Sequence, residues 1–294
     1  MAMRRALLPA AILATLVAAV SPSAAQSRVD RPVSVDRRFP IDRDAYVKIY
    51  LLDGEVLVTG WEKDSIAVTG TVESGQLFSG GRGKSAKLGL WEGPGSGRLD
   101  VKVPASATVW VKSESAAVSV SGIAGGVDVY SVTGEIRIGG SPRQLYAESM
   151  GGDVVVEASA PSVRAKTAAG KIIFRGRAED LLLSTVSGAI DAAAVSPPLR
   201  ARLETVTGGV LWEGDVERGG SLDFQTHSGA VDLSFPRSLD AEVSVSTVKG
   251  SISGKPGPAA ASEAPLRGPT VDILAGAGGA RIGIRTFSGD VTFR

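Results

Sequence analysis

Apolar and polar residues alternate in short runs along most of the chain. Val127 and Val129 form one such pair, and Ile136 and Ile138 form another, with a single residue between the members of each pair. A period of two over four or five residues is typical of a β-strand with one buried face. Beyond residue 25, no segment shows a sustained apolar stripe with the 3.6-residue period of a helix. The pattern therefore predicts an all-β protein.

The alternating runs recur together with a short motif: a Ser or Thr, two variable residues, a Gly, and two hydrophobic residues separated by one position. The Ser or Thr positions are Ser113 (a degenerate copy), Ser131, Ser149, Thr167, Thr185, Thr205, Thr226, Thr247 and Thr286. The spacing is constant as far as Thr185 and then lengthens slightly, and the last step, from Thr247 to Thr286, is about twice as long as the others. A second alternating run precedes each Ser or Thr, so each repeat contains two strands and two turns.

One repeat cannot bury its own apolar face, but stacked repeats enclose a continuous core between two parallel sheets. We therefore predict a flattened parallel β-solenoid, a β-helix-like fold with about 18–21 residues per two-strand rung, and we favour right-handed winding. A left-handed triangular helix has coils of similar length. It requires an aliphatic residue at every sixth position, however, and the nine-residue halves of this repeat fit it poorly.

The Ser/Thr and Gly positions of the motif have structural explanations. The Ser/Thr side chains share the parity of the core positions, so stacked hydroxyls are expected to bond to each other or to turn amides. The Gly is expected to adopt a positive φ or to allow a close backbone approach between rungs. No base is placed to activate these hydroxyls, so we do not interpret the column as nucleophiles.

Residues 46–294 are predicted to form a single solenoid domain, with residues 26–45 as an N-terminal lead-in or cap. Two segments interrupt the repeat, residues 73–98 and residues 254–269, and are predicted to be excursions from the stack. The sequence ends at Arg294 inside the last repeat. This position predicts an open C-terminal sheet edge, through which copies of the chain could associate into a homo-oligomer.

Residues 1–25 have the features of a secretory signal peptide, with Arg4 and Arg5 before an apolar stretch and small residues at positions 23–25. We therefore expect export to the periplasm, the cell surface or the extracellular space. No later segment approaches about 18 uninterrupted apolar residues, so no membrane span is expected in the mature chain. Removal of the two Arg changes the formal net charge from +1 to −1, which argues against a nucleic-acid partner.

Three stretches carry a resemblance to a known family. They are Gly-Glu-Val-Leu-Val-Thr-Gly-Trp-Glu at 54–62, Thr-Val-Ser-Gly-Ala-Ile at 185–190 and Thr-Phe-Ser-Gly-Asp-Val-Thr-Phe at 286–293. Over roughly residues 43–294 the sequence resembles the bacterial putative adhesin family, an exported domain of unknown function. The resemblance implies a β-solenoid-like protein of the cell envelope, and it carries over no catalytic residue.

Outward-facing positions of the second strand of each rung suggest a binding surface. One column contains Trp110, Asp128, Tyr146, Arg164 and Leu182, and the next contains Lys112, Tyr130, Glu148, Lys166 and Ser184. Aromatic rings interleaved with basic groups can stack on sugar rings or bind an anionic polymer. The predicted ligand- or partner-binding residues are Trp110, Tyr130, Tyr146, Arg164 and Lys166.

Two structural interpretations of this strip remain open. Neighbours such as Glu148 and Lys166 would be ordinary cross-rung pairs on a solvated sheet. Alternatively, residues 73–98, which include Phe78 and Trp91, would fold over the aromatic side chains and bury them.

Other candidate chemistry is sparse. Asp191 and Asp232 could form a polysaccharide-cleaving pair, but two rungs separate them by about 10 Å, slightly more than an inverting pair requires. His227 is the only His, and it occupies a turn position that is otherwise largely apolar, where it is expected to be packed rather than to bind a metal. The chain has no Cys for disulfides or thiolate sites. We predict no catalytic residue, metal or cofactor.

The sequence therefore favours an exported, non-enzymatic β-solenoid that acts as an adhesin or envelope interaction module. A polysaccharide-binding or polysaccharide-cleaving protein and a structural or assembly component are the alternatives.

Overall fold

Strands account for all the regular secondary structure in the part of the chain that the computed structural model describes, residues 32–91, 95–237, 239–256 and 270–294. The all-β prediction is confirmed. The expected signal peptide and residues 257–269 of the second expected excursion lie outside the described residues. Among the described residues, no helix has the length and apolar character needed to cross a membrane.

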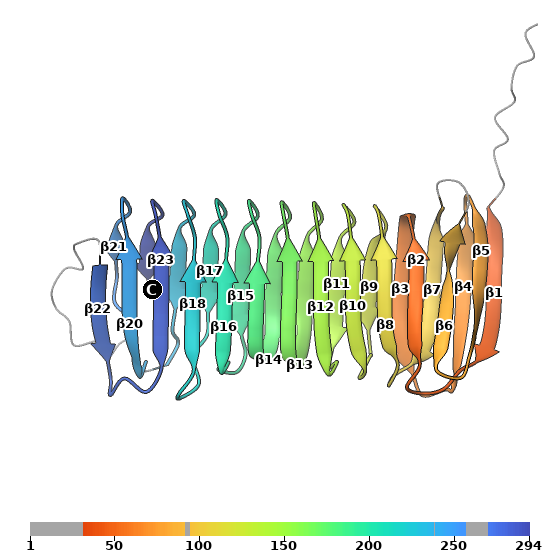
Figure 1. Cartoon of the computed structure of the whole chain (residues 1–294), viewed down its shortest axis with the longest axis horizontal. Coiled ribbons are helices and arrows are strands. Elements are labelled where there is room, and N and C mark those ends of the chain that lie inside the picture. The colour runs from red at the N-terminus through yellow and green to blue at the C-terminus, as the bar shows by residue number, and fades with distance from the viewer. Residues whose placement is uncertain (1–31, 92–94, 238, 257–269) are drawn as a thin grey trace, which may run out of the picture. The chain divides into compact units, whose positions relative to one another are not determined.

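The strands of residues 31–294 form two stacks, sheet A and sheet B, which are joined by turns (Figure 1). Sheet A contains β1 (Val33–Pro40), β3 (Asp53–Trp61), β4 (Ser65–Val72), β7 (Ser96–Pro104), β9 (Ala117–Ser121), β11 (Ile136–Gly140), β15 (Ile190–Ala194), β17 (Val210–Glu213), β19 (Val231–Ser234), β21 (Ile252–Ser253) and β24 (Val291–Phe293). Sheet B contains β2 (Tyr46–Leu51), β5 (Gln76–Arg82), β6 (Ser85–Trp91), β8 (Thr108–Ser113), β10 (Gly126–Ser131), β12 (Gln144–Ser149), β16 (Arg200–Glu204), β18 (Ser221–Gln225), β20 (Ala241–Thr247), β22 (Thr270–Ala275) and β23 (Arg281–Thr286). The long strands β13 (Val154–Thr167) and β14 (Ile172–Ser184) contribute to both sheets.

The register of the parallel pairs reproduces the sequence period. In sheet B, Val109 pairs with Val127, Val127 with Leu145 and Leu145 with Val163, so each step equals the constant spacing of the motif in this part of the sequence. Longer steps follow where the sequence spacing lengthens, from Leu181 to Ala201 and onward to Leu222. The pairing confirms a β-solenoid-like stack of two-strand rungs, and the handedness stays a prediction.

Both ends of the stack depart from chain order. The rung β2–β3 lies between β6–β7 and β8–β9, so that Tyr46 pairs with both Ser85 and Thr108. At the other end, β23–β24 lies between β18–β19 and β20–β21, and Ile282 pairs with both Leu222 and Val243. The long last step of the motif is therefore a return of the chain into the stack.

This arrangement corrects two predictions. The described part of residues 73–98 is not an excursion, because β5, β6 and the start of β7 belong to the two sheets. The last strand is not an open edge, because β24 has a paired strand on each side. Antiparallel strands lie outermost at three of the four sheet edges: β1 beside β4, β5 beside β6, and β22 beside β20. At the fourth edge, in sheet A, the outermost described strand is the short β21, which pairs in parallel with β24. Self-association itself stays a prediction, but the strand at the edge of sheet A is β21 and not the C-terminal β24.

The recurring turn is held by its hydroxyl and its Gly. In one copy, the backbone N–H of Gly188 donates to the buried Thr185 hydroxyl at 3.1 Å, and that hydroxyl lies 3.5 Å from the carbonyl oxygen of Gly170 in the preceding rung. A Cβ added to Gly188 would lie 1.7 Å from the same carbonyl oxygen. The motif therefore requires Gly for close approach between rungs and not for a positive φ. The bond to the turn amide was expected, and so was direct bonding between hydroxyls, which occurs between Ser113 and Ser131.

Inward-facing residues fill the space between the sheets. The core consists mainly of Val, Ile, Leu and Ala, and its largest fully buried side chains are Trp212, Phe174 and Phe224. The Trp212 ring packs edge-on to Phe224 at 5.8 Å between centroids, and its indole N–H donates to the Gly214 carbonyl at 2.9 Å. Because the polar atom of Trp212 is satisfied, this large ring is accommodated without an unpaired donor.

Replacement of Gly188 by Ala is expected to destabilise the protein by about 3 kcal/mol or more, because backbone atoms of two rungs would have to separate. Gly80→Ala is the matched control, since a Cβ there has no atom within 4 Å, and it should be neutral or stabilising by at most about 1 kcal/mol. Urea unfolding monitored by circular dichroism compares the two variants. Equal unfolding midpoints would refute the close-approach explanation.

Thr185→Val removes a buried acceptor without changing the size of the side chain, and it leaves the Gly188 N–H without its partner. The expected loss of stability is about 1–3 kcal/mol. Thr185→Ser retains the hydroxyl and should lose clearly less. The same unfolding measurement tests this ranking, and a Val variant as stable as the Ser variant would contradict it.

Candidate binding surface

The five residues predicted to bind a ligand or partner all lie on the outward face of sheet B. Trp110 comes from β8, Tyr130 from β10, Tyr146 from β12, and Arg164 and Lys166 from β13. Trp110 pairs with Asp128, Asp128 with Tyr146, and Tyr146 with Arg164, so these residues form the outward-facing column that the sequence predicted. The structure therefore brings the five side chains onto one strip, while their binding role stays a prediction.

The aromatic members belong to a longer series of outward-facing rings, which we call the aromatic ladder. It consists of Trp91, Phe78, Tyr50, Trp110, Tyr130 and Tyr146 in spatial order. Successive ring centroids are separated by 6.5, 6.3, 5.3, 5.8 and 5.3 Å. Neighbouring rings cover each other, so all but the exposed Trp91 are half-buried although they lie on the surface.

Three of these rings were not among the predicted site residues. Tyr50 joins the ladder because β2 pairs directly with β8, although β3 to β7 lie between these two strands in the chain. The signal was present in the sequence, since Tyr50 precedes Gly54 by the same four positions by which Lys112 precedes Ala116. Phe78 pairs with Gly89, which has no side chain, so the Phe78 ring lies beside Tyr50. The described part of residues 73–98 thus extends the ladder beyond Tyr50, and its rings lie beside Tyr50 and not over Trp110 or Tyr146.

The ladder is electrically neutral but contains polar groups. The Tyr146 hydroxyl donates to the Glu148 carboxylate. Burial, followed by this bond to Glu148, raises the pKa of Tyr146 well above its ordinary value of 10, and burial also raises the pKa of Tyr130. Burial among these rings raises the pKa of Asp128 above 3.8. The surface therefore combines ring faces with carboxylate acceptors.

Basic groups follow the ladder along the same face. Arg164, Arg200 and Arg202 line a groove of about 440 Å³ together with Leu182, Asp180 and Asp223. Arg200 makes a two-pronged ion pair with Asp180, with one N–O distance of 2.9 Å, and Arg202 pairs with Glu204. Within the described part of the chain, neither Arg164 nor Lys166 makes an ion pair, and Glu148 bonds to Tyr146 instead of Lys166. The cross-rung pairing proposed for Glu148 and Lys166 is therefore not formed.

An open apolar pocket of about 550 Å³ lies at the Trp91 end of the ladder. Its lining residues are Tyr50, Leu52, Phe78, Lys87, Leu90 and Trp91. The Lys87 ammonium group lies 4.9 Å from the centre of the Tyr50 ring and 5.5 Å from that of Phe78. A single cation at the edge of an apolar pocket suits a ligand with an apolar body and one anionic group.

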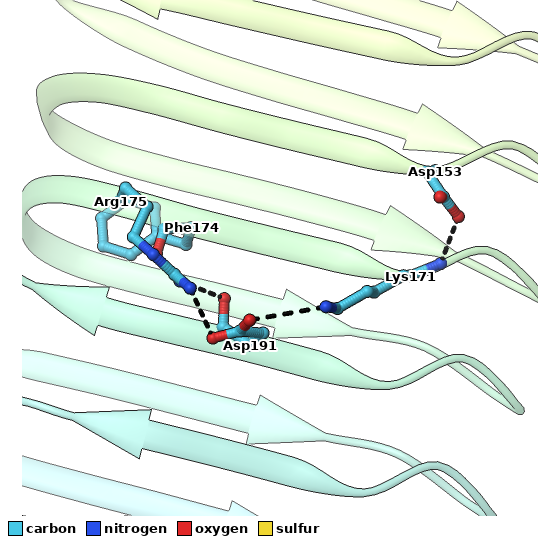
Figure 2. A network of polar contacts seen from close by, with 5 residues as sticks. All are labelled: Asp153, Lys171, Phe174, Arg175 and Asp191. Atoms are coloured by element: carbon cyan, nitrogen blue, oxygen red, sulfur yellow. Dashed lines mark hydrogen bonds and ion pairs between the residues drawn. The ribbon is translucent and has the colours of Figure 1, made fainter.

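The carboxylates considered for catalysis lie on sheet A and are bound to basic side chains. Figure 2 shows Asp191 between Arg175, which donates to its Oδ1 at 2.8 Å, and Lys171, at 3.4 Å from its Oδ2. Asp232 pairs with Arg294 at 3.2 Å. Both acids line one small pocket of about 230 Å³ with Leu211 between them, and no third carboxylate lines it. An inverting pair needs one carboxyl to deliver a proton, whereas ion pairing suits a structural role.

His227 does not pack inside the turn as the sequence suggested. Its imidazole is exposed and stacks on Phe287 with 4.9 Å between ring centroids. The other large apolar residues of this turn position, such as Met150 and Val186, are exposed as well. Among the residues that the structure describes, no three His, Asp or Glu side chains gather as a metal site.

Comparisons with known proteins concern the family and the fold. The model of a family described as Toastrack DUF4097 matches residues 92–294, and no curated protein matches the chain. A crystal structure of a putative adhesin from Parabacteroides merdae ATCC 43184 superposes with a TM-score of 0.52 at 12% identity, covering 89% of this chain and 96% of that one. A crystal structure of a putative lipid binding protein from Parabacteroides distasonis ATCC 8503 superposes with a TM-score of 0.53 at 11% identity, covering 90% of this chain and 97% of that one. A putative adhesin from the same strain has a TM-score of 0.51 and 12% identity, and the match covers 89% of this chain and 97% of that one. The family resemblance seen in the sequence is confirmed.

Asp128→Asn is expected to change how stability depends on pH. The folded state retains the Asp128 proton above pH 3.8, where the unfolded chain already loses it, so stability falls as pH rises through the folded pKa and remains reduced above it. The variant should match the wild type near pH 3 and gain relative stability between about pH 4 and 7. Unfolding midpoints measured across this range test the prediction. A difference that does not vary with pH would contradict it.

Proposed function

This chain belongs to the Toastrack DUF4097 family, and we propose that it is an adhesion or interaction module of the cell envelope that binds through the aromatic ladder, Arg164 and Lys166. The observation that carries the proposal is the ladder itself, six consecutive rings on an outward sheet face with 5.3–6.5 Å between neighbours. The putative adhesins among the similar structures support this class of function through their fold.

A saccharide chain is the ligand class that the surface fits best. The C–H faces of sugar rings stack on aromatic rings, and sugar hydroxyls donate to carboxylates such as those of Asp128 and Glu148. Arg164 and Lys166 follow directly, and they add a preference for acidic groups on the saccharide. Because the rings and the basic groups lie along one line of stacked strands, an extended chain of several sugar units would contact them in sequence.

A purely structural role explains the aromatic and basic groups of this strip less well. A solvated sheet face is normally polar and gains little from large rings, while clusters of aromatic and basic groups are typical of binding surfaces. Cleavage of the bound saccharide is not part of the proposal, because the acids at the ladder lie among tyrosines and the paired acids of sheet A lie on the other sheet.

A second candidate is lipid binding at the apolar pocket beside Trp91. Its apolar lining and single Lys87 fit an acyl chain with an anionic headgroup. One of the similar structures is that of a putative lipid binding protein, and its likeness to this chain is one of fold.

The function is tested with a glycan array followed by calorimetry on the chain from Gln26 onward. Trp110→Ala with Tyr146→Ala should weaken saccharide binding roughly 10-fold to 100-fold, since two stacking contacts at about 0.5–1.5 kcal/mol each amount to about 1–3 kcal/mol. Arg164→Gln with Lys166→Gln should weaken binding of acidic saccharides only. Leu211→Ala with Val195→Ala, two exposed apolar residues away from the ladder, is the control and should bind as the wild type does.

Saccharide binding by the Trp110/Tyr146 variant at wild-type strength, or its absence in the wild type, would refute the proposal. Binding of anionic lipid that is lost in Phe78→Ala with Trp91→Ala, and retained in the Trp110/Tyr146 variant, would favour the second candidate instead.

A further inference from the structure

Basic side chains flank the aromatic ladder at two places on the outward face of sheet B. Along the stack, the strands of this face follow one another as β6, β2, β8, β10, β12 and β13 (Figure 1). The first group, which we call cluster 1, lies on β6, β2 and β8 and consists of Lys87, Lys48 and Lys112. The second group, cluster 2, lies on β13 and consists of Arg164 and Lys166. Strands β10 and β12 therefore separate two groups of positive charge.

Within the residues that the structure describes, none of these five cations makes an ion pair. In cluster 1 the like charges lie side by side, because Lys48 on β2 pairs directly with Lys87 on β6, and their repulsion costs stability. Several outward cations of sheet A have carboxylate partners instead, as Arg98 has in Glu55 at 3.1 Å. The two clusters thus present positive charge that no ion pair compensates in the described part of the chain.

Two acids of the same face lie between the clusters. Asp128 on β10 pairs with Trp110 and Tyr146, and Glu148 on β12 accepts the hydroxyl of Tyr146. An anionic group above these strands would face carboxylates, whereas a neutral sugar can stack on the rings and donate its hydroxyls to the same carboxylates. The surface is therefore positive at both ends and suits neutral units in the middle.

The strand spacing sets the distance between the clusters. Lys112 and Lys166 are three strand positions apart, and Lys48 and Arg164 are four positions apart. At about 4.8 Å for each position, the backbones of these pairs are separated by about 14 Å and about 19 Å. A single sugar ring cannot span such a distance, so anionic groups that reach both clusters must belong to different units of one ligand chain.

We propose that the ladder binds a saccharide whose acidic units are separated by neutral ones, with one anionic group at cluster 1, another at cluster 2 and neutral rings stacked between them. This inference rests on saccharide binding by the ladder and adds the pattern of charge along the ligand. The anionic group is a carboxylate or a sulfate, since Lys and Arg bind either one through charge-assisted hydrogen bonds. A saccharide with charge on every unit fits less well, because its central charges would face Asp128 and Glu148.

A single-stranded nucleic acid also combines stacking rings with anionic groups. It carries a phosphate at every nucleotide, however, so its central phosphates would lie above Asp128 and Glu148 and be repelled. The saccharide is therefore favoured, and an oligothymidylate is the probe that distinguishes the two.

Calorimetry with hexasaccharides tests the charge pattern on the chain from Gln26 onward. The probes are a neutral form, a form with acidic units only at its two ends, a form with two adjacent acidic units and a form that is acidic throughout, each acidic form made with uronate and with sulfate. The wild type should bind the form with terminal acids roughly 10-fold more tightly than the others, in at least one of the two series. Raising the salt from about 50 to about 500 mM should remove most of this preference.

Charge-removing variants test each cluster separately. Lys48→Gln with Lys112→Gln alters cluster 1, and neither residue lines the apolar pocket beside Trp91. This variant should bind the form with terminal acids roughly 10-fold more weakly, and the loss should be clearly larger than for the neutral form. Arg164→Gln with Lys166→Gln should show the same selective loss.

Lys102→Gln with Lys249→Gln is the matched control. These lysines are exposed, as Lys48 and Lys112 are, but Lys102 lies on sheet A and Lys249 lies in the turn between β20 and β21. The control removes the same amount of charge and should bind every probe as the wild type does.

Three results would overturn the charge pattern. They are unchanged binding of the form with terminal acids by the Lys48/Lys112 variant, equally tight binding of the adjacent or fully acidic forms, and an oligothymidylate that the wild type binds more tightly than any hexasaccharide. The last result would identify a nucleic acid as the occupant. Failure of the proposed function itself gives a different result, because the Trp110/Tyr146 variant would then bind the neutral hexasaccharide as the wild type does, whatever the charge variants show.

Discussion

The contact between the Gly of one turn and the carbonyl oxygen of the turn before it sets the geometry of the whole stack. At Gly170, Gly188, Gly208 and Gly229, a Cβ would lie 1.7–2.1 Å from that oxygen. The buried hydroxyl three residues earlier fixes the same turn by accepting the Gly N–H. With this corner held at one spacing, equivalent residues of successive rungs are forced into columns. The core and the aromatic ladder are both such columns.

The regular middle of the fold could be predicted from the sequence, because there the chain's neighbours in space are its neighbours in the repeat. Val127 pairs with Val109 and Leu145 at the expected spacing, and the outward columns follow from it. The ends could not be predicted in this way. Tyr46 pairs with Ser85 and Thr108, and no period of the repeat encodes separations as long as these. The repeat also offered a plausible but wrong partner at the other end, since the Thr226 and Thr247 copies are separated by an ordinary step of the motif.

The candidate site also has a part that could be predicted from the repeat and a part that could not. Trp110, Tyr130, Tyr146, Arg164 and Lys166 belong to regular rungs and were placed correctly on one face. Tyr50, Phe78 and Trp91 belong to the irregular end, and only the structure joined them to the series. Alternation separates buried from outward positions within strands, but it says nothing of a turn. His227 is therefore predicted to pack in its turn, whereas it is exposed, as are Met150 and Val186 at the same turn position.

The return of β23 into the stack has a consequence for the order of assembly. β23 lies between β18 and β20, both of which precede it in the chain. A chain that emerges from its N-terminus can add rungs one by one through β18, but it cannot then place β20 in its final position, because the strand between them has not yet appeared. Closing this end requires a loop to form before its contacts stabilise it, which makes the step slow relative to local stacking. Local, sequential growth therefore accounts for the middle of the molecule, whereas its C-terminal end is completed by insertion.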